Sequence, residues 1–363
     1  MKTGHGTGQR CPNSHTVEGS HIQSLSWTPW HHRLHQRLLA SPDLLPQGKT
    51  LLLAVSGGQD SMALLGLLRD LTHLHHWTLA LWHGDHRWHQ HSSKIAADLD
   101  QWCHGQGLPL QIEAAPDDLS QTEADARDWR YGCLAQLANA SGADAVTGHT
   151  ASDRAETLLQ QLSRGCDLAG LGSLRAVRLL DANAPKGAQL RRPLLGFTRQ
   201  ETAKICSALQ LPVWDDPGNQ SSDFARNRIR HEVMPVLQEL YPGCSLRLAA
   251  TASRMAQHSD ATQELSQLAL QGLKDGCKVR RRELGRLSTA ARRVILRAWI
   301  LQEGATPPAA KILEQLSSRL KIGEPAGRVD LRNGWHLTWR DAFVELTHTP
   351  IDQKPCTQKH NET

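Results

Sequence analysis

The sequence predicts an α/β fold in which a doubly wound, parallel five-stranded sheet is followed by a smaller, mainly helical C-terminal domain. Between residues 50 and 195, short apolar runs alternate with stretches of helical periodicity, a pattern typical of βαβ units. After residue 245 the pattern is mostly helical, and it ends in an alternating apolar and polar stretch around Asn333 and Gly334 that is typical of a hairpin. A length of 363 residues suits two domains.

The elements of the first domain follow from the periodicity of its apolar residues. Strands are expected at 51–55, 77–82, 108–113 and 143–147, and helices at 60–71, 92–105, 123–140, 153–162 and 198–209. A helix from Trp27 precedes the first strand, and a loop at 181–187 precedes the apolar segment 193–195. Right-handed crossovers then place helices on both faces of the sheet.

Composition divides the chain into five parts. These are a disordered tail (1–26), an N-terminal domain (27–215), a basic linker helix (216–245), a C-terminal domain (246–346) and a second polar tail (347–363). The first tail is rich in Gly, Ser, Thr and His, so it cannot bury enough apolar surface to offset its ordering entropy.

Several protein classes are excluded by composition. At 39% hydrophobic and 21% charged residues, the chain is too apolar to be disordered, and it has no run of roughly 18 apolar residues that would cross a membrane. The N-terminus lacks the apolar segment of a secretory signal, so we expect a cytoplasmic protein with no membrane partner. The eight cysteines contain no C-x-x-C pair, which argues against a zinc ribbon or an iron–sulfur cluster.

The most informative segment is a glycine loop between the first apolar strand and the next helix. Its sequence, S-G-G-Q-D-S, permits a sharp turn and close approach to a ligand, and it leads into a helix N-terminus that attracts anions. Neither the Walker pattern nor the dinucleotide pattern is present. The segment therefore predicts a phosphate site, with a plain glycine-rich turn as the alternative. The predicted nucleotide ligands are Ser56, Gly57, Gly58, Gln59, Asp60 and Ser61.

This loop resembles the S-G-G-x-D-S signature of the N-type ATP pyrophosphatases, the PP-loop family. The resemblance implies a PP-loop ATP pyrophosphatase fold and cleavage of ATP between its α and β phosphates. A carboxylate beside phosphates is suited to magnesium, so Asp60 is the expected metal ligand, acting together with ATP and also in catalysis.

Further segments follow in order and resemble those of the tRNA(Ile)-lysidine synthetases across roughly residues 50–240. They are H-G-D-H at 83–86, E-A-D-A-R-D-W-R-Y at 123–131, G-H-T-A-S-D-R-A-E-T at 148–157, R-P-L-L at 192–195, D-P-G-N at 216–219 and R-N-R-I-R at 226–230. The resemblance implies a tRNA-modifying ligase that adenylates C2 of the wobble cytidine in the CAU anticodon of isoleucine tRNA. Free lysine then displaces AMP to give lysidine. The alternatives are ATP-dependent tRNA base thiolation by a related PP-loop enzyme and a tRNA-binding protein with a degenerate nucleotide site.

Two carboxylates and a histidine follow the fourth predicted strand. Asp153 and Glu156 are three residues apart on a helix, so they share a face and need a cation between them, either magnesium or a lysine ammonium. The resemblance implies lysine, with Arg130 as a further lysine-binding residue, while a solvated helix face is the alternative. His149 is expected to contact the nucleotide or to remove a proton, so His149, Asp153 and Glu156 join Asp60 as catalytic candidates.

Two basic segments are expected to contact tRNA. Arg226, Arg228 and Arg230 lie in the linker, and Arg281 and Arg292 lie in a run at 278–297 with eight Lys or Arg residues against one acid. Solvated helices are the alternative. A homodimer is one assembly that the sequence allows, but nothing in it selects the oligomeric state.

Overall fold

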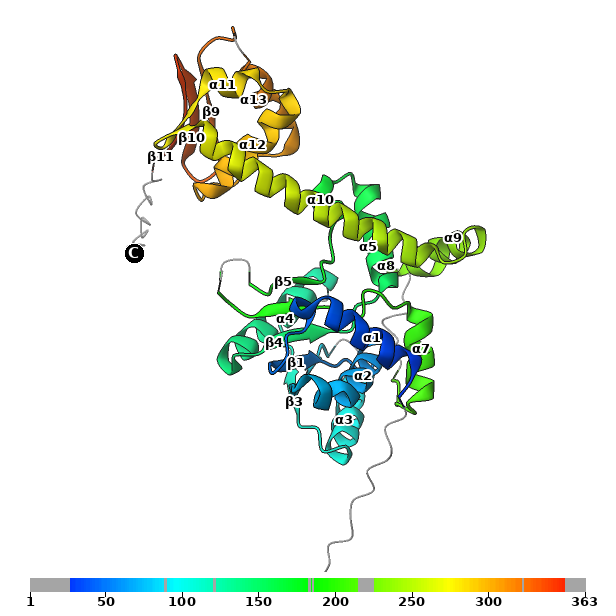
Figure 1. The fold of residues 1–363 in the computed structure, drawn as a ribbon. Coiled ribbons are helices and arrows are strands. Elements are labelled where there is room, and N and C mark those ends of the chain that lie inside the picture. The colour runs from blue at the N-terminus through cyan, green and yellow to red at the C-terminus, as the bar shows by residue number, and fades with distance from the viewer. Residues whose placement is uncertain are drawn as a thin grey trace, which may run out of the picture. The chain divides into compact units, whose positions relative to one another are not determined.

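A computed structural model describes residues 27–87, 90–119, 122–181, 184, 186–214, 225–321 and 323–349. The predicted tail at 1–26, most of the tail at 347–363 and the start of the linker lie outside these residues. The chain forms two compact units, one of residues 1–150 with 176–220 and the other of residues 151–175 with 221–363 (Figure 1).

The first unit is built on a sheet with the strand order β3-β2-β1-β4-β6-β5. The first five of these strands are parallel, which confirms the predicted five-stranded parallel sheet, and β5 adds a sixth strand antiparallel to β6 at the edge. The strands are β1 (Thr50–Ala54), β2 (Thr78–Asp85), β3 (Leu110–Ala114), β4 (Asp144–Thr147), β5 (Val177–Leu179) and β6 (Gln189–Arg191).

Helices lie on both faces of this sheet, which explains why the three central residues of β1 are all leucines. Leu51 and Leu53 are buried in one core cluster, whereas Leu52 is buried in another. The first cluster includes residues of α1 (Pro29–Ala40), α2 (Gln59–His75), α3 (Gln90–Gly105) and α7 (Arg199–Ala208), and the second includes α4 (Glu123–Ser141). The short 3₁₀ helix η1 (Pro42–Leu44) joins α1 to β1.

The second unit begins with α5 and α6, both of which pack against the long helix α10. This packing groups residues 151–175 with the C-terminal part of the chain, although the sequence analysis assigned them to the N-terminal domain. The helices are α5 (Ala151–Arg164), α6 (Leu168–Leu171), α8 (Ala225–Arg228), the π-helix η3 (Ile229–Val233), α9 (Met234–Leu240) and α10 (Cys244–Leu273).

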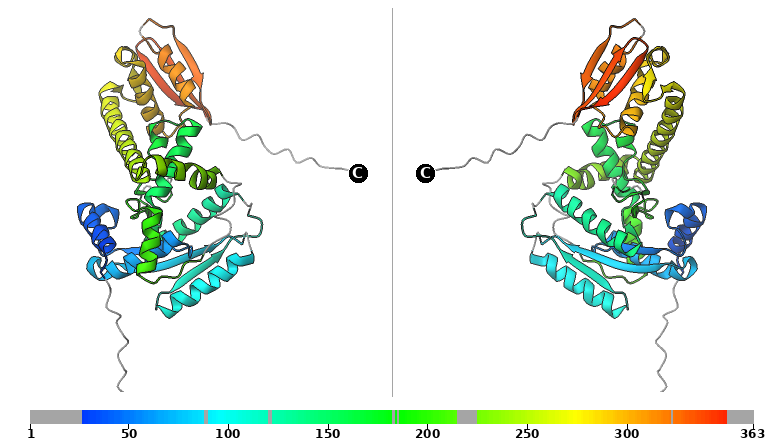
Figure 2. Two further views of the ribbon diagram at one scale, coloured as in Figure 1. Left: turned by 90° about the vertical axis from the view of Figure 1, so that its right-hand side faces the viewer. Right: turned by 90° about the vertical axis from the view of Figure 1, so that its left-hand side faces the viewer.

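The C-terminal part of this unit combines helices with an antiparallel sheet of order β7-β8-β11-β10-β9. Figure 2 shows the strands β9, β10 and β11 side by side with helices against them, and Leu337, Trp339 and Trp299 lie in their shared core. The predicted hairpin at Asn333 and Gly334 is present, and both residues have positive φ. The elements are β7 (Lys274–Asp275), β8 (Lys278–Arg280), α11 (Arg281–Arg286), α12 (Thr289–Gln302), α13 (Ala310–Arg319), β9 (Gly327–Asp330), β10 (Trp335–Arg340) and β11 (Phe343–His348).

The described part of the chain has no helix that combines the length and the apolar character needed to cross a bilayer.

A histidine pair between α1 and α2 makes the stability of the first unit sensitive to pH. His35 Nδ1 and His75 Nε2 are 3.0 Å apart, and the His75 ring stacks on Trp77. Burial, together with the neighbouring His35 and His76, holds the pKa of His75 below its ordinary value of 6.5. The unfolded chain therefore binds a proton at a pH where the folded chain does not.

We expect the free energy of unfolding to fall as the pH drops from about 7 to about 5, because protonation then favours the unfolded state. A His75→Gln variant should lose less stability over the same interval, as measured by urea unfolding at each pH. Equal slopes for the two proteins would show that His75 does not carry this dependence.

Candidate functional site

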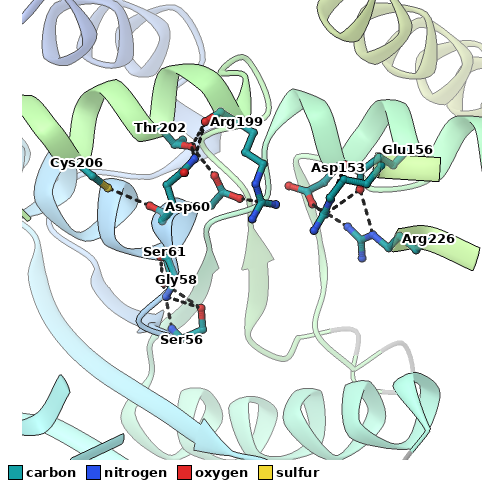
Figure 3. Close-up of polar contacts among 12 residues, drawn as sticks. Ser56, Gly58, Asp60, Ser61, Asp153, Glu156, Arg199, Thr202, Cys206 and Arg226 are labelled. Carbon is teal, nitrogen blue, oxygen red and sulfur yellow. Dashed lines mark hydrogen bonds and ion pairs between the residues drawn. The ribbon is translucent and has the colours of Figure 1, made fainter. Parts of the chain in front are cut away.

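The predicted phosphate loop lies between β1 and α2 and is held by hydrogen bonds of its own residues (Figure 3). The Ser61 hydroxyl donates to the Gly58 carbonyl at 2.8 Å and accepts from the Ser56 amide at 3.2 Å. The Gly58 amide in turn donates to the Ser56 hydroxyl at 3.3 Å. Ser61 is buried, so its hydroxyl shapes the loop, while the Ser56 side of the loop is exposed.

The loop leads directly into the N-terminus of α2. Gly58 is the N-cap and provides no side-chain cap, so backbone amides at the start of the helix are available for a ligand together with the positive end of the helix dipole. Gly57 has a φ of 78°, a conformation that glycine adopts without strain. This arrangement of a strand, a glycine turn and an uncapped helix suits a phosphate group.

Three residues of α7, which no sequence motif indicated, contact Gln59 of the loop. The Gln59 amide donates to the Thr202 hydroxyl at 2.8 Å and to the Arg199 carbonyl at 2.6 Å. The Cys206 thiol lies 3.2 Å from the Gln59 carbonyl. Gln59 was predicted as a nucleotide ligand, but its side chain is bound to α7, which leaves its backbone for that role.

The Asp60 carboxylate contacts α7 through both of its oxygens. The Thr202 hydroxyl donates to Oδ1 at 2.5 Å, and Arg199 Nη1 lies 3.5 Å from Oδ2. A carboxylate at this position offers the oxygen ligand that magnesium prefers when it binds together with phosphates. The Asp60 carboxylate therefore fits the predicted metal, and its role as the metal ligand stays a prediction.

Gly148, which follows β4, touches the backbone of the loop. A Cβ atom at this position would lie 2.8 Å from the Asp60 carbonyl oxygen and 2.9 Å from the Ser61 nitrogen. Contacts this short do not occur for real side chains, so only glycine allows the approach. The next residue, His149, is half-buried and its Nδ1 lies 2.8 Å from the Thr147 hydroxyl.

Replacing Gly148 with alanine should therefore displace the backbone at Asp60. We expect ATP binding to weaken by at least about tenfold and stability to fall by about 1–3 kcal/mol, the usual cost of forcing extra atoms into a packed site. Gly142→Ala is not a suitable control because Gly142 has positive φ, whereas a Cβ atom at Gly132 meets nothing and its φ is ordinary. Calorimetric ATP titration of Gly148→Ala and Gly132→Ala tests this, and similar affinities would contradict it.

A second cluster lies in the other unit and joins α5 to the helical segment after residue 224. Asp153 and Glu156 are 7% and 2% exposed, and two arginines neutralise them. Arg226 Nη2 is 2.8 Å from Asp153 Oδ1. Arg230 donates from Nε to Glu156 Oε1 and from Nη2 to Glu156 Oε2, each at 2.9 Å. Burial of two carboxylates requires such cations, because an unpaired buried charge is strongly unfavourable.

This cluster changes how the basic linker is interpreted. Arg226 and Arg230 were predicted to contact tRNA, but both guanidinium groups are bound to carboxylates. Figure 3 shows Arg226 beside Asp153 and Glu156. Arg228 is the exposed member of the three and pairs with Glu232 one turn later. The predicted lysine-binding role of Asp153 and Glu156 requires that a lysine ammonium compete with an arginine.

The other predicted residues are distributed over both units. Arg130 is a half-buried residue of α4 in the first unit, whereas Asp153 and Glu156 belong to the second, so a shared lysine site remains a prediction. The run at 278–297 is not one helix but β8, α11 and part of α12.

Arg292 does not fit its predicted role in tRNA contact. It is 2% exposed, and its guanidinium donates to the Gly285 carbonyl at 2.7 Å and to the Thr289 hydroxyl at 3.0 Å. Arg281 is half-buried and binds the backbone carbonyl of Glu324, so its tRNA contact stays a prediction. The exposed arginines of the run are Arg282, Arg286, Arg293 and Arg297.

Comparison with known proteins agrees with this geometry. A family described as "PP-loop domain" matches residues 31–237, and a "TilS substrate binding domain" matches residues 280–342. A tRNA(Ile)-lysidine synthase of Parasynechococcus marenigrum is 58% identical over 323 residues, covering 89% of this chain and 96% of the relative. An enzyme of the same name from Prochlorococcus marinus is 40% identical, covering 88% of this chain and 96% of the relative.

One solved structure shares the fold. The U34-tRNA thiolase NcsA of Methanococcus maripaludis superimposes with a TM-score of 0.53 at 17% identity, covering 63% of this chain and 78% of the thiolase. At this identity the likeness concerns the fold alone. The match of the PP-loop domain to more than half of the chain and the identity to the two synthases place this chain in the tRNA(Ile)-lysidine synthase family of PP-loop proteins.

Proposed function

We propose that this chain is a tRNA-modifying ligase that converts the wobble cytidine of the CAU anticodon of isoleucine tRNA to lysidine. The observation that carries the proposal is the loop at residues 56–61, with Asp60 held beside an uncapped helix N-terminus, in a chain of this family. ATP and free lysine are the other substrates, and the products are AMP and pyrophosphate. A tRNA substrate would be met in the cytoplasm, so we propose that location for the protein.

The first step makes the base electrophilic. The C2 oxygen of cytidine attacks the α-phosphorus of ATP, so that an oxygen–phosphorus bond forms and the bond to pyrophosphate breaks. The loop amides and the N-terminus of α2 bind the departing phosphates and stabilise the charge that develops on them. Asp60 would hold magnesium together with ATP, and this metal would supply further charge neutralisation.

The second step joins lysine to the base. The ε-amine has a pKa of about 10.4 in water, so it must lose a proton before it attacks C2. A nitrogen–carbon bond then forms, the C2–oxygen bond breaks and AMP leaves. We assign recognition of the ammonium, and acceptance of its proton, to Asp153 and Glu156 of the second unit. Contact of Arg130 with the lysine carboxylate and proton removal by His149, both residues of the first unit, stay predictions.

Lysine can bind at Asp153 and Glu156 only if one of the two arginines breaks its ion pair with a carboxylate. Arg226 is the better candidate to move, because it makes one short contact, at 2.8 Å to Asp153, and one of 3.4 Å to Glu156. Arg230 makes two 2.9 Å contacts with Glu156 and a third of 3.2 Å with Asp153. An arginine released in this way gains a free charge that suits a tRNA phosphate. This exchange reconciles the predicted tRNA role of Arg226 with its ion pair.

The alternative of base thiolation gains no support from the cysteines of the first unit that the structure describes. Burial, together with Asp60, raises the pKa of the Cys206 thiol to about 12. Burial likewise raises the pKa of Cys133 to about 12 and of Cys103 to about 11. These thiols stay protonated at neutral pH, whereas sulfur transfer requires a thiolate.

Incubation with ATP, labelled lysine and a tRNA carrying a CAU anticodon tests the proposal. We expect label on the wobble cytidine in a one-to-one ratio with AMP. A tRNA with a U in place of that cytidine is the control and should remain unlabelled. Nucleotide turnover that requires sulfide instead of lysine would support thiolation, and an absence of turnover would exclude both reactions.

A further inference from the structure

The helix α7 contacts both oxygens of the Asp60 carboxylate, but the two contacts differ in kind. Thr202 is fully buried, and its hydroxyl reaches Oδ1 at 2.5 Å while accepting from Gln59 at 2.8 Å. The Arg199 side chain is 38% exposed, and its Nη1 lies 3.5 Å from Oδ2. The first contact is a hydrogen bond of a fixed group, and the second is a looser ion pair of a long, partly exposed side chain.

The arrival of a nucleotide changes the charge balance at this point. Asp60 would hold a metal that binds with the triphosphate, and that metal would supply the positive charge that Arg199 otherwise provides. The released guanidinium then lies beside a triphosphate, and arginine binds phosphate through two parallel hydrogen bonds. Arg199 is the first residue of α7, so its side chain can move while Thr202, one turn later, stays in place.

We propose that Arg199 is a triphosphate-binding residue that leaves Asp60 for the β- and γ-phosphates when ATP binds, and that Thr202 is the positioning residue that keeps Asp60 in place. The inference rests on the proposed function for the identity of the nucleotide. The phosphate site would then include α7, in addition to the loop at residues 56–61 and the start of α2.

Calorimetric titration of Arg199→Gln with ATP and with AMP, in magnesium, tests the role of Arg199. AMP lacks the β- and γ-phosphates, so we expect about 10- to 100-fold weaker binding of ATP and a change of less than about twofold for AMP. Lys204→Gln is the matched control, because it removes a charge from an exposed position on the same helix and should leave both affinities unchanged. Equal weakening for both nucleotides, or none, would overturn the assignment.

Thr202→Val and Thr202→Ser test the positioning role. Valine keeps the shape but loses the hydroxyl, so it should weaken binding of ATP with magnesium by about tenfold and leave binding of ATP in EDTA unchanged, while serine should restore the wild-type affinity. Loss of binding under both conditions in a folded Thr202→Val protein, or no loss, would contradict it. A wild-type protein that binds no ATP would refute the proposed function itself, whereas normal binding by Arg199→Gln would refute only this inference.

Discussion

Replacing Asp60 with asparagine should lower the rate of AMP formation by roughly two to three orders of magnitude, the loss typical of removing one electrostatic group from an active site. Asparagine retains the shape of the side chain and an oxygen that accepts from Thr202. It removes the negative charge that would hold magnesium and that pairs with Arg199. The fold should therefore persist while the chemistry is lost. The measurement is single-turnover release of AMP with saturating tRNA and lysine.

The control is Asp100→Asn, which removes a carboxylate from an exposed position on α3 in the same unit. It should turn over at the wild-type rate. Binding of tRNA to Asp60→Asn should also be unchanged, because the substitution lies in the nucleotide site. An Asp60→Asn protein with wild-type AMP formation would show that this carboxylate has no part in the reaction.

Replacing Glu156 with alanine should destabilise the second unit by about 3–5 kcal/mol, the cost of leaving buried charges without a partner. Glu156 is 2% exposed, and its loss leaves two guanidinium groups with Asp153 as the remaining carboxylate of the cluster. Arg230 would lose both of its 2.9 Å contacts. Urea unfolding followed by circular dichroism measures the change.

A second arginine–glutamate pair provides the comparison. Arg228 and Glu232 lie 2.8 Å apart on an exposed face, so solvent screens their charges and Glu232→Ala should change the stability little. The stability loss of Glu156→Gln should lie between those of Glu156→Ala and Glu232→Ala, since glutamine keeps one hydrogen-bond acceptor without the charge. If Glu156→Ala and Glu232→Ala were equally stable, the buried cluster would not hold α5 to the helices after residue 224.

The features that could be predicted from the sequence are those set by neighbouring residues. The apolar run of β1, the glycines that follow it and the apolar residues near the start of α2 are consecutive, so strand, loop and helix could be placed together. The parallel sheet followed from the alternation of such units. The three-residue strand β5 carries no comparable pattern, and it pairs with β6 through residues that are not neighbours in the sequence, such as Val177 and Arg191.

The features that could not be predicted depend on contacts between distant segments. Thr202 reaches Asp60 across 142 positions, and no local pattern indicates this contact. The carboxylates of α5 were expected to need magnesium or a lysine ammonium as their cation, whereas the structure pairs them with Arg226 and Arg230. Arg292 illustrates a signal that could have been used, because its spacing from Ile295 and Trp299 places it on the buried face of α12.

The oxygen of the modified base provides the most direct test of the proposed reaction. A tRNA carrying ¹⁸O at C2 of the wobble cytidine should transfer that oxygen to AMP in every turnover, because this oxygen attacks the α-phosphorus and leaves with it. Mass spectrometry of the AMP and of the digested tRNA follows the isotope. Recovery of ¹⁸O in AMP together with lysidine in the tRNA is the predicted result. Formation of lysidine with unlabelled AMP would contradict adenylation of the base and with it the role assigned to the loop at residues 56–61.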